Sequence, residues 1–191
     1  HRSPGVFFDE TMHPNGKRLF SARILPYKGP WLEFSMDIND IMYVHIDRRR
    51  KLPVSLLLKA MGLSKGGEIL SLFRPDVEVV VDDDLIGRYN SSEDIINKET
   101  GEIIVEAFDD ITSEHLEALR EAGIGKLTGL AAPEGTDPGV MENTLKKDPS
   151  ENEEDALTRI YNLLRPGDPP NIETARGLLD RLFFNAKRYN L

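Results

Sequence analysis

The sequence contains no cysteine. Disulfide bonds, thiolate nucleophiles and cysteine-ligated metal centres are therefore all excluded. Histidine is also scarce, and none of the four histidines stands at a metal-binding interval from another, so each is expected to be a surface or structural residue. The motifs GxxxxGK(S/T), GxGxxG, GxSxG and HExxH are missing as well. The sequence therefore predicts no catalytic residue, no metal site and no cofactor of its own.

Long apolar segments are lacking too. A membrane-spanning helix needs about 20 mostly apolar residues, and no run in this chain approaches that length. No signal peptide is visible either. The lack of cysteine fits a reducing cytoplasm, and we expect no membrane partner. The chain begins without Met on the turn HRSPG and ends on RYNL after an amphipathic segment, so we expect it to be a piece of a longer protein.

Positive charge is in deficit, because 24 Lys and Arg stand against 33 Asp and Glu, a formal net charge of −9. This balance argues against coating of nucleic acid by the whole surface. Any contact with nucleic acid must then come from a local basic patch, for which residues 48–51 (RRRK) are the leading candidate. The acidic runs at 82–84 and 151–155 are typical of solvated faces. Carboxylates suit Mg²⁺, but the first run lacks the spacing of a metal-binding loop.

Short strands dominate the first third of the chain. Aromatic and branched residues form four runs separated by turn-forming Pro, Gly, Asn and Asp. The runs are residues 6–8, 17–25, 31–36 and 42–46. This pattern predicts a meander of β-hairpins. Apolar residues then recur at helical spacing after Pro53, with Gly62 suited to end that helix, and a second short helix is expected at 67–72.

A separate module is expected at residues 77–130. Within it, VEVVVD and EIIVEAF are typical of strands. Thr112 is placed to cap a helix that stops at Gly123. This pattern predicts a compact module of strands and one helix, and we expect the module to be an insertion.

The last third of the chain predicts helices joined by loops. Residues 131–149 are rich in Ala, Pro, Gly and Asp and predict a loop. Ser150 and Glu153 have capping-box spacing ahead of one helix, and a final helix is expected from Asn171. The fold class is therefore α+β: a β-hairpin meander with a small helical cluster and an inserted β-rich module.

Several residues offer chemistry for binding nucleic acid rather than for catalysis. Arg2 and the basic run that begins at Arg48 can neutralise phosphates or contact guanine. Trp31, the only tryptophan, offers a flat face on which an unpaired base can stack. Asp47 can accept from a base amino group or hold an arginine in position. A tryptophan at the start of a strand is often core, however, and an RRRK run is often a solvated edge, so the residues alone leave both readings open.

Five segments together resemble the β subunit of bacterial DNA-dependent RNA polymerase. They occur in the family's order and cover nearly the whole chain except about residues 77–135. The segments are HRSPGVFFD, ILPYKGPWLEF, HIDRRRKLPVSLLLKAMG, ENTLKKDPSENEEDALTRIYNLLRPGDPP and LLDRLFFNAKRYNL. The resemblance places the chain in the lobe, or β2 domain, on one side of the DNA cleft. It implies lobe core at 1–76 and 136–191 and an accessory module at 77–135.

The resemblance implies roles for five residues. Trp31 would stack on an unpaired non-template base near the start of the downstream DNA. Arg2 and Asp47 would line the pocket for an extruded guanine, with Arg48 supporting the same surface. Asn190 stands where the family often has Asp, and an amide cannot offer a carboxylate to both guanine N–H groups, which puts base preference in doubt.

The resemblance also implies partners. These are the non-template strand and downstream DNA, the polymerase subunits α, β′ and ω, and sigma factor. Nucleotidyl transfer would belong to the assembled enzyme, because the family's catalytic Mg²⁺ site lies in β′, and the location would be the cytoplasm, at the nucleoid. The alternative function is a platform whose acidic surface and inserted module dock transcription factors. A free-standing enzyme is disfavoured by the missing catalytic constellation.

Overall fold

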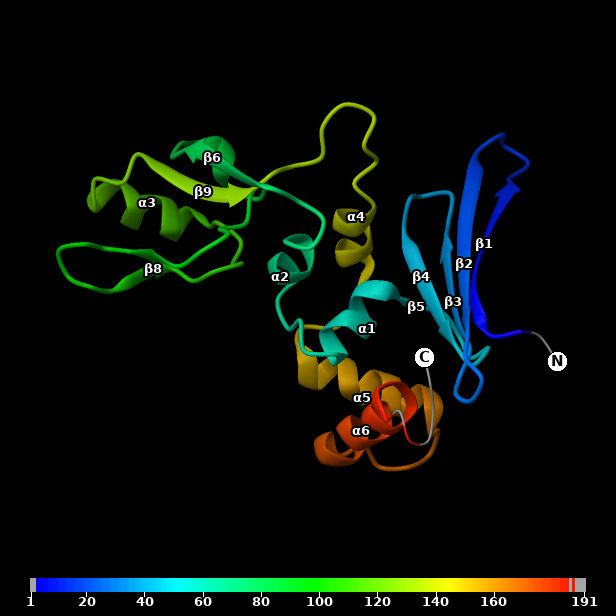
Figure 1. The fold of residues 1–191 in the computed structure, drawn as a ribbon. Helices are drawn as coiled ribbons and strands as arrows, with labels where there is room; N and C mark the ends of the chain where they lie inside the picture. The colour runs from blue at the N-terminus through cyan, green and yellow to red at the C-terminus, as the bar shows by residue number, and fades with distance from the viewer. Residues whose placement is uncertain (1–2, 186, 188–191) are drawn as a thin grey trace. The chain divides into compact units, whose positions relative to one another are not determined.

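The computed structural model describes residues 3–185 and residue 187. The chain packs as two compact units. Unit 1 comprises His1–Ser64 and Pro138–Leu191, and unit 2 comprises Lys65–Asp137. Figure 1 shows unit 1 as a sheet with helices and unit 2 as short strands with helices. The mixture of helices and antiparallel strands confirms the α+β class. The accessory nature of residues 77–135 stays a prediction, because the division into units describes packing alone.

Unit 1 contains a five-stranded antiparallel sheet in the order β1-β2-β3-β4-β5. Its strands are β1 Gly5–Met12, β2 Arg18–Leu25, β3 Leu32–Met36, β4 Met42–Ile46 and β5 Leu52–Pro53. Neighbours along the chain pair with each other, as in Gly5↔Leu25 and Leu32↔Ile46. The predicted meander of hairpins is therefore confirmed.

Unit 1 also has helices, the first two of which pack against β4 and β5 at one edge of the sheet. They are α1 Val54–Ala60, α4 Val140–Lys147, α5 Glu153–Leu164 and α6 Ile172–Leu179, the last continuing as a π-helix over Asp180–Phe184. α1 lies against β4 and α5, and α5 lies against α6. The buried apolar side chains of this core include Leu32, Val44, Ile46, Leu56, Leu57, Leu157 and Ile160.

Two predictions for the last third of the chain are wrong. The expected loop at 131–149 contains α4, whose Thr144 side chain is fully buried and accepts a hydrogen bond from the backbone N–H of Met42 in β4. Ser150 does not cap α5; the cap is Asn152, whose side chain accepts from the N–H of Asp155. Tertiary contacts fixed both outcomes, since Ser150 is engaged in a different buried network.

That network joins α1 to the segment after α4. The Asp148 carboxylate is fully buried and lies 3.2 Å from the Lys59 ammonium. It also accepts from the Ser55 hydroxyl at 2.6 Å and from the N–H of Ser150 at 2.8 Å. Lys59 donates in addition to the Ser150 carbonyl at 2.6 Å. A buried ion pair is tolerated only when further hydrogen bonds satisfy it, and here several do.

Unit 2 is built from two small antiparallel pairs and two helices. Its elements are α2 Gly66–Leu70, β6 Asp76–Val80, a 3₁₀ turn at Asp83–Leu85, β7 Ile95–Ile96, β8 Ile103–Val105, α3 Ser113–Glu121 and β9 Lys126–Leu130. β6 pairs with β9, which the sequence pattern had not predicted, and β7 pairs with β8. Thr112 caps α3 by accepting from the N–H of His115, as predicted. The core cluster is Leu85, Ile95, Val105, Ile111, Leu116, Leu119 and Leu127.

Gly67 allows a close approach of backbone within unit 2. A Cβ at this position would lie 2.1 Å from the carbonyl oxygen of Phe108. Phe108 has φ of 69°, a left-handed backbone conformation that is uncommon for a residue other than glycine. The same carbonyl accepts a hydrogen bond from the Asn90 side chain at 3.2 Å. Any side chain at position 67 would therefore push the Phe108 backbone away and strain its hydrogen bond with Asn90.

The two units differ strongly in charge. Unit 2 carries 18 Asp and Glu against six Lys and Arg, a formal charge of −12. Since the whole chain carries −9, unit 1 carries +3. The acidic character of the protein therefore belongs to unit 2. In the described part of the chain, no helix is both long enough and apolar enough to cross a membrane.

Candidate nucleic-acid interface

Sheet pairing brings three of the predicted contact residues together at one end of the unit 1 sheet. Trp31 directly precedes β3, and Asp47 and Arg48 directly follow β4. Because Leu32 pairs with Ile46, the residues just beyond that pair become neighbours. The backbone N–H of Asp47 donates to the Trp31 carbonyl at 2.8 Å. Antiparallel register thus places residues that are 16 positions apart side by side.

A tight turn orients Arg48. Asp47 and Arg48 have φ of 50° and 61°, and the N–H of Arg49 donates to the Ile46 carbonyl at 3.0 Å. Two central residues with positive φ define the turn type that suits the twist of paired strands, and Gly or Asn is preferred there. A left-handed backbone costs a residue such as arginine about 1 kcal/mol. The turn therefore holds Arg48 in a conformation that local preference disfavours.

The Arg48 guanidinium lies over the Trp31 ring. Its central carbon is 4.9 Å from the ring centroid, the geometry of a cation–π contact worth about 0.5–1 kcal/mol at exposed sites. Trp31 is half-buried, and Asp47 and Arg48 are exposed. The tryptophan is therefore not a core residue, and the basic residue beside it is not simply solvated. Together they form an indole ring with a cation over one face and a carboxylate-bearing residue on the adjoining turn.

The rest of the basic run divides into two kinds of residue. Lys51 places its ammonium 4.2 Å from the centroid of the Tyr43 ring, so it braces β4. Burial of Tyr43, and then the negative charge of Asp37, raise the pKa of that phenol. Arg49 and Arg50 are exposed. Trp31, Asp47 and Arg48 are called the Trp31 site below. The two exposed arginines that follow it in the chain can therefore contact phosphate.

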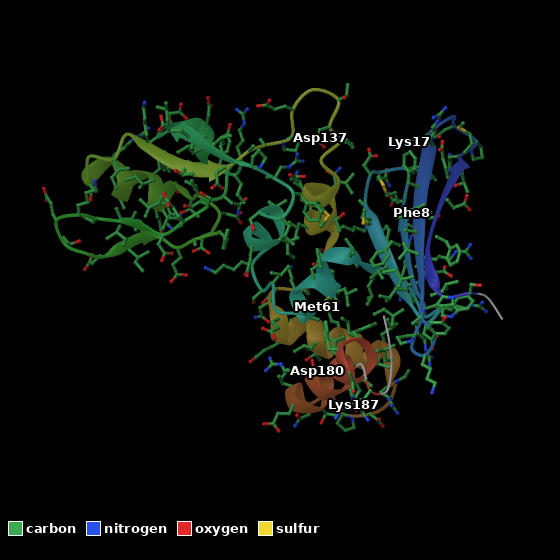
Figure 2. All side chains as sticks on the ribbon, in the orientation of Figure 1. Phe8, Lys17, Met61, Asp137, Asp180 and Lys187 are labelled. Carbon is green, nitrogen blue, oxygen red and sulfur yellow. The ribbon has the colours of Figure 1, made fainter. Side chains whose placement is uncertain are left out.

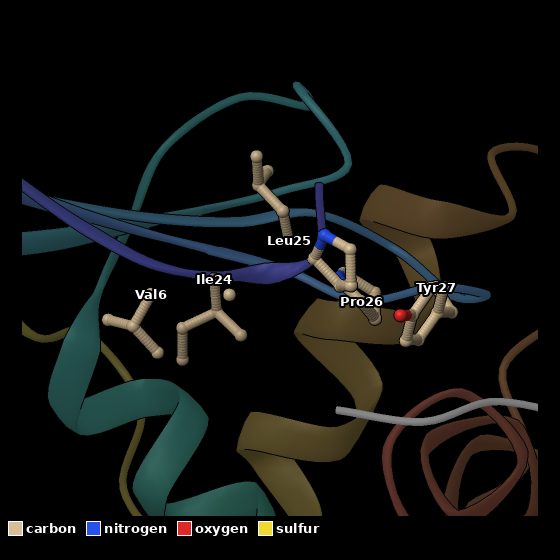
Figure 3. A pocket seen from close by; sticks show the side chains of 7 residues that line it. Val6, Ile24, Leu25, Pro26 and Tyr27 are labelled. Carbon is tan, nitrogen blue, oxygen red and sulfur yellow. The ribbon is translucent and has the colours of Figure 1, made fainter. Parts of the chain in front are cut away.

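A small apolar pocket lies at the same end of the sheet (Figure 3). Its volume is about 180 Å³, and its lining comes from the start of β1 and the residues around the end of β2. The residues are Pro4, Gly5, Val6, Ile24, Leu25, Pro26 and Tyr27. Apart from the Tyr27 hydroxyl it offers no titratable group, so its chemistry suits packing of an apolar or planar group rather than catalysis.

Arg2 and Asn190 lie outside the described residues, so the structure places three of the five predicted residues and leaves these two as predictions. Within residues 3–185 and residue 187, no cluster of three His, Asp or Glu side chains is arranged to hold a metal ion. The sequence reasoning missed the contact between Arg48 and Trp31. That contact depends on the two-residue turn after β4. The turn was not recognisable from the sequence, because Asp47 and Arg48 occupy positions where glycine or asparagine is usual.

Comparison with known proteins gives one consistent family. The family model RNA polymerase Rpb2, domain 2, matches residues 2–116. The DNA-directed RNA polymerase subunit beta of Porphyromonas cangingivalis is 42% identical over 212 residues. The corresponding proteins of Christiangramia forsetii and Bacteroides fragilis are 39% and 40% identical over 213 and 211 residues. Each match covers 100% of this chain and 17% of the relative, so the chain spans about a sixth of these proteins. The chain therefore belongs to the family of the β subunit of DNA-directed RNA polymerase.

Proposed function

We propose that this chain is the lobe of the β subunit in a bacterial RNA polymerase, where it contacts the non-template strand and the downstream DNA during initiation and elongation. The observation that carries the proposal is the Trp31 site: an indole ring at the surface, a guanidinium 4.9 Å from its centroid and a carboxylate on the adjoining turn. These groups match the needs of an unpaired base, which stacks on a ring and carries a phosphate beside it.

In this proposal Trp31 stacks on an unpaired non-template base. Arg48 covers one face of the ring, so the base takes the other face. Stacking of a base on an aromatic side chain is worth about 1–3 kcal/mol. The cation–π contact restrains the ring, and the hydrogen bond from the Asp47 N–H to the Trp31 carbonyl fixes the backbone that carries it. Both lower the entropy lost when the base arrives. Arg48 thus acts as a positioning residue for Trp31.

Asp47 would read the edge of an extruded guanine, together with Arg2 and Asn190. Its carboxylate is exposed beside Trp31, and an ionised carboxylate can accept from two guanine N–H groups. The amide of Asn190 can accept only through its single oxygen, so selectivity for guanine would rest on Asp47.

The charge of the two units supports assigning DNA contact to unit 1. Unit 1 carries +3, and its exposed Arg49 and Arg50 flank the Trp31 site. Unit 2 carries −12 and would repel phosphate. The isolated chain is accordingly expected to bind DNA weakly, and a salt titration of the 191-residue chain that showed tight binding would contradict this.

An apolar stripe on β1 and β2 supports assembly into a larger protein. Val6, Phe8 and Met12 share one face of β1 and, with Phe20 of β2, expose large apolar side chains, of which Phe8 is 82% exposed (Figure 2). This face is the continuation of the one that bears the buried Val44 and Ile46 nearer the helices. Several large exposed apolar side chains on one face usually mark an interface. We assign it to the rest of the β subunit and its partners α, β′, ω and sigma factor.

Nucleotidyl transfer would then belong to the assembled enzyme in the cytoplasm, at the nucleoid, and the chain would add no cofactor to it. A second role is favoured by the charge of unit 2, which suits a surface for docking transcription factors rather than DNA. The first role concerns the Trp31 site, and the second concerns unit 2 alone.

The test of the first role uses the full-length subunit assembled into RNA polymerase. Trp31→Ala should weaken crosslinking to the non-template strand at one position and shorten the lifetime of the open complex by about tenfold, the loss of one stacking contact. Trp31→Phe should retain part of both, because a ring remains. An open complex whose lifetime and crosslinks match the unsubstituted enzyme would refute the stacking role.

A further inference from the structure

The outer edge of β6 has no strand partner in the described residues, where β6 belongs to a two-stranded sheet with β9. Two flanking hydrogen bonds fix how its backbone groups point: the N–H of Val81 donates to the Gly125 carbonyl, and that of Ala131 donates to the Pro75 carbonyl, both at 2.9 Å. In an antiparallel pair the direction alternates from residue to residue. The N–H and C=O groups of Asp76, Glu78 and Val80 therefore point away from β9, toward the open edge.

The two faces of β6 differ in chemistry. On one face Asp76, Glu78 and Val80 are exposed, and the Val80 side chain is 59% exposed. On the other face Val77 and Val79 are half-buried, and Val79 packs against the core cluster of unit 2. A strand added to this edge would place its alternate side chains beside these two rows. The matching strand alternates between basic and apolar residues.

Charge complementarity selects the occupant. Unit 2 carries −12, and residues 82–84, three consecutive aspartates, lie one residue beyond the end of β6. The Glu78 carboxylate pairs with the Lys126 ammonium of β9 at 3.1 Å, but the net charge of unit 2 remains strongly negative. A nucleic acid would therefore be repelled, and so would a second copy of this unit. Proteins usually blunt an open edge with charged side chains, Pro or a bulge; β6 contains no Pro and no bulge, and its two charged residues, Asp76 and Glu78, are both acidic. The edge is thus closed to self-pairing and open to a cationic strand.

We propose that the outer edge of β6 binds an extended protein segment in which Lys or Arg alternates with apolar residues, by β-strand addition. Backbone hydrogen bonds to Glu78 and Val80 would supply affinity, and the acidic and apolar rows would set the register. This inference rests on the second role proposed above, protein docking by unit 2, and gives that role a place and a partner chemistry.

The experiment measures binding of a fluorescein-labelled nine-residue peptide of alternating Lys and Val to the 191-residue chain. A block peptide of the same composition, with all lysines before all valines, controls for charge alone. We expect the alternating peptide to bind at least about tenfold more tightly, because only it matches both faces of β6. On binding, the amide hydrogens of Glu78 and Val80 should exchange more slowly, while those of Val77 and Val79, already paired with β9, should change little.

Two variants locate the contact. Val80→Pro removes an outward N–H without removing a bond to β9, a position where an edge strand tolerates proline, and should weaken peptide binding by at least about tenfold. Val80→Thr keeps that N–H and should bind the alternating peptide more tightly than Val80→Pro does. The exchange measurement on the unsubstituted chain stands even if the proline variant folds poorly.

The outcomes separate this inference from the role on which it rests. Equal affinity for the alternating and block peptides, or unchanged exchange at Glu78 and Val80, would overturn strand addition. If peptide protection then appeared elsewhere in residues 65–137, protein docking by unit 2 would stand without the β6 edge. If neither peptide bound, or protection fell only in unit 1, both ideas would be refuted.

Discussion

Replacing Asp148 by alanine should destabilise unit 1 more than any surface change. The Asp148 carboxylate is fully buried, and the Lys59 ammonium beside it is 7% exposed. With the carboxylate gone, Lys59 keeps only the Ser150 carbonyl. The N–H and hydroxyl of Ser150 and the hydroxyl of Ser55 lose their acceptor. The variant thus leaves a buried charge uncompensated and three donor groups without their acceptor.

The magnitude follows from these losses. Breaking a buried ion pair by removing one partner costs about 3–5 kcal/mol. With a urea dependence of about 1–3 kcal/mol per molar for a unit of this size, the unfolding midpoint should fall by about 2 M. Replacing both partners together, as in Lys59→Met with Asp148→Leu, should cost less than Asp148→Ala, because no buried charge is stranded.

The assay is urea unfolding followed by tryptophan fluorescence. Trp31 is the only tryptophan and lies in unit 1, so the signal reports unit 1 without interference from unit 2. Arg159→Ala is the matched control, since its partner Asp155 lies on the exposed face of α5 and such pairs contribute under about 1 kcal/mol. If Asp148→Ala shifted the midpoint no more than Arg159→Ala, the reasoning about the buried network would be refuted.

Three further substitutions test other parts of the fold. Thr144→Val should cost about 1–3 kcal/mol, because the Met42 N–H loses its acceptor, and Thr144→Ser should recover most of that loss in the same urea assay. Gly67→Ala should destabilise unit 2, because its Cβ would lie 2.1 Å from the Phe108 carbonyl; amide exchange within residues 65–137 measures this. For Tyr43, burial raises the phenol pKa above its usual 10.0, so folding is stabilised below that value and loses stability as pH rises through the folded pKa. Tyr43→Phe should remove this part of the alkaline loss, as urea unfolding against pH would show.

The glycine substitution has a control in the same unit. Gly125→Ala introduces a Cβ with no atom within 4 Å, so it should leave amide exchange in unit 2 nearly unchanged. A Gly67→Ala variant with the exchange pattern of Gly125→Ala would mean that the Phe108 segment yields easily. The pH prediction fails if Tyr43→Phe and the unsubstituted chain lose stability in parallel above pH 10.0.

Local patterns were sufficient where a segment's own residues determine its structure. The strands of the meander were predicted because alternating side chains and turn residues specify hairpins. The cap of α3 was predicted because Thr112 and the start of that helix are adjacent in sequence. Asn171 likewise begins the last helix through its own side chain, which accepts from the N–H groups of Glu173 and Thr174.

Long-range contacts explain what was missed. α4 has a weak start signal, since its N-cap Gly139 makes no side-chain cap, and it is held instead by the contact of Thr144 with β4. Ser150 has the sequence spacing of a helix cap, but its hydroxyl donates a hydrogen bond to the Asp148 carboxylate instead. β9 contains Gly129 within a short strand and gains its place by pairing with β6.

The sequence predicted which residues belong to the candidate site but not how they are arranged in space. Trp31, Asp47 and Arg48 were recognisable by residue type and family resemblance. Their arrangement depends on the positive φ angles of the turn after β4. Neither Asp47 nor Arg48 is a residue type from which positive φ would be predicted. The position of Arg48 over the indole ring follows from that turn and from the pairing of β3 with β4.

The most direct test of the central claim is a scan of the non-template strand with the fluorescent base 2-aminopurine in open complexes of the assembled polymerase. Stacking on an aromatic ring quenches this base. The account predicts one quenched position near the start of the downstream duplex, with the quenching lost in Trp31→Ala and partly kept in Trp31→Phe. The same quenching pattern in all three enzymes would contradict the claim that Trp31 stacks on a non-template base.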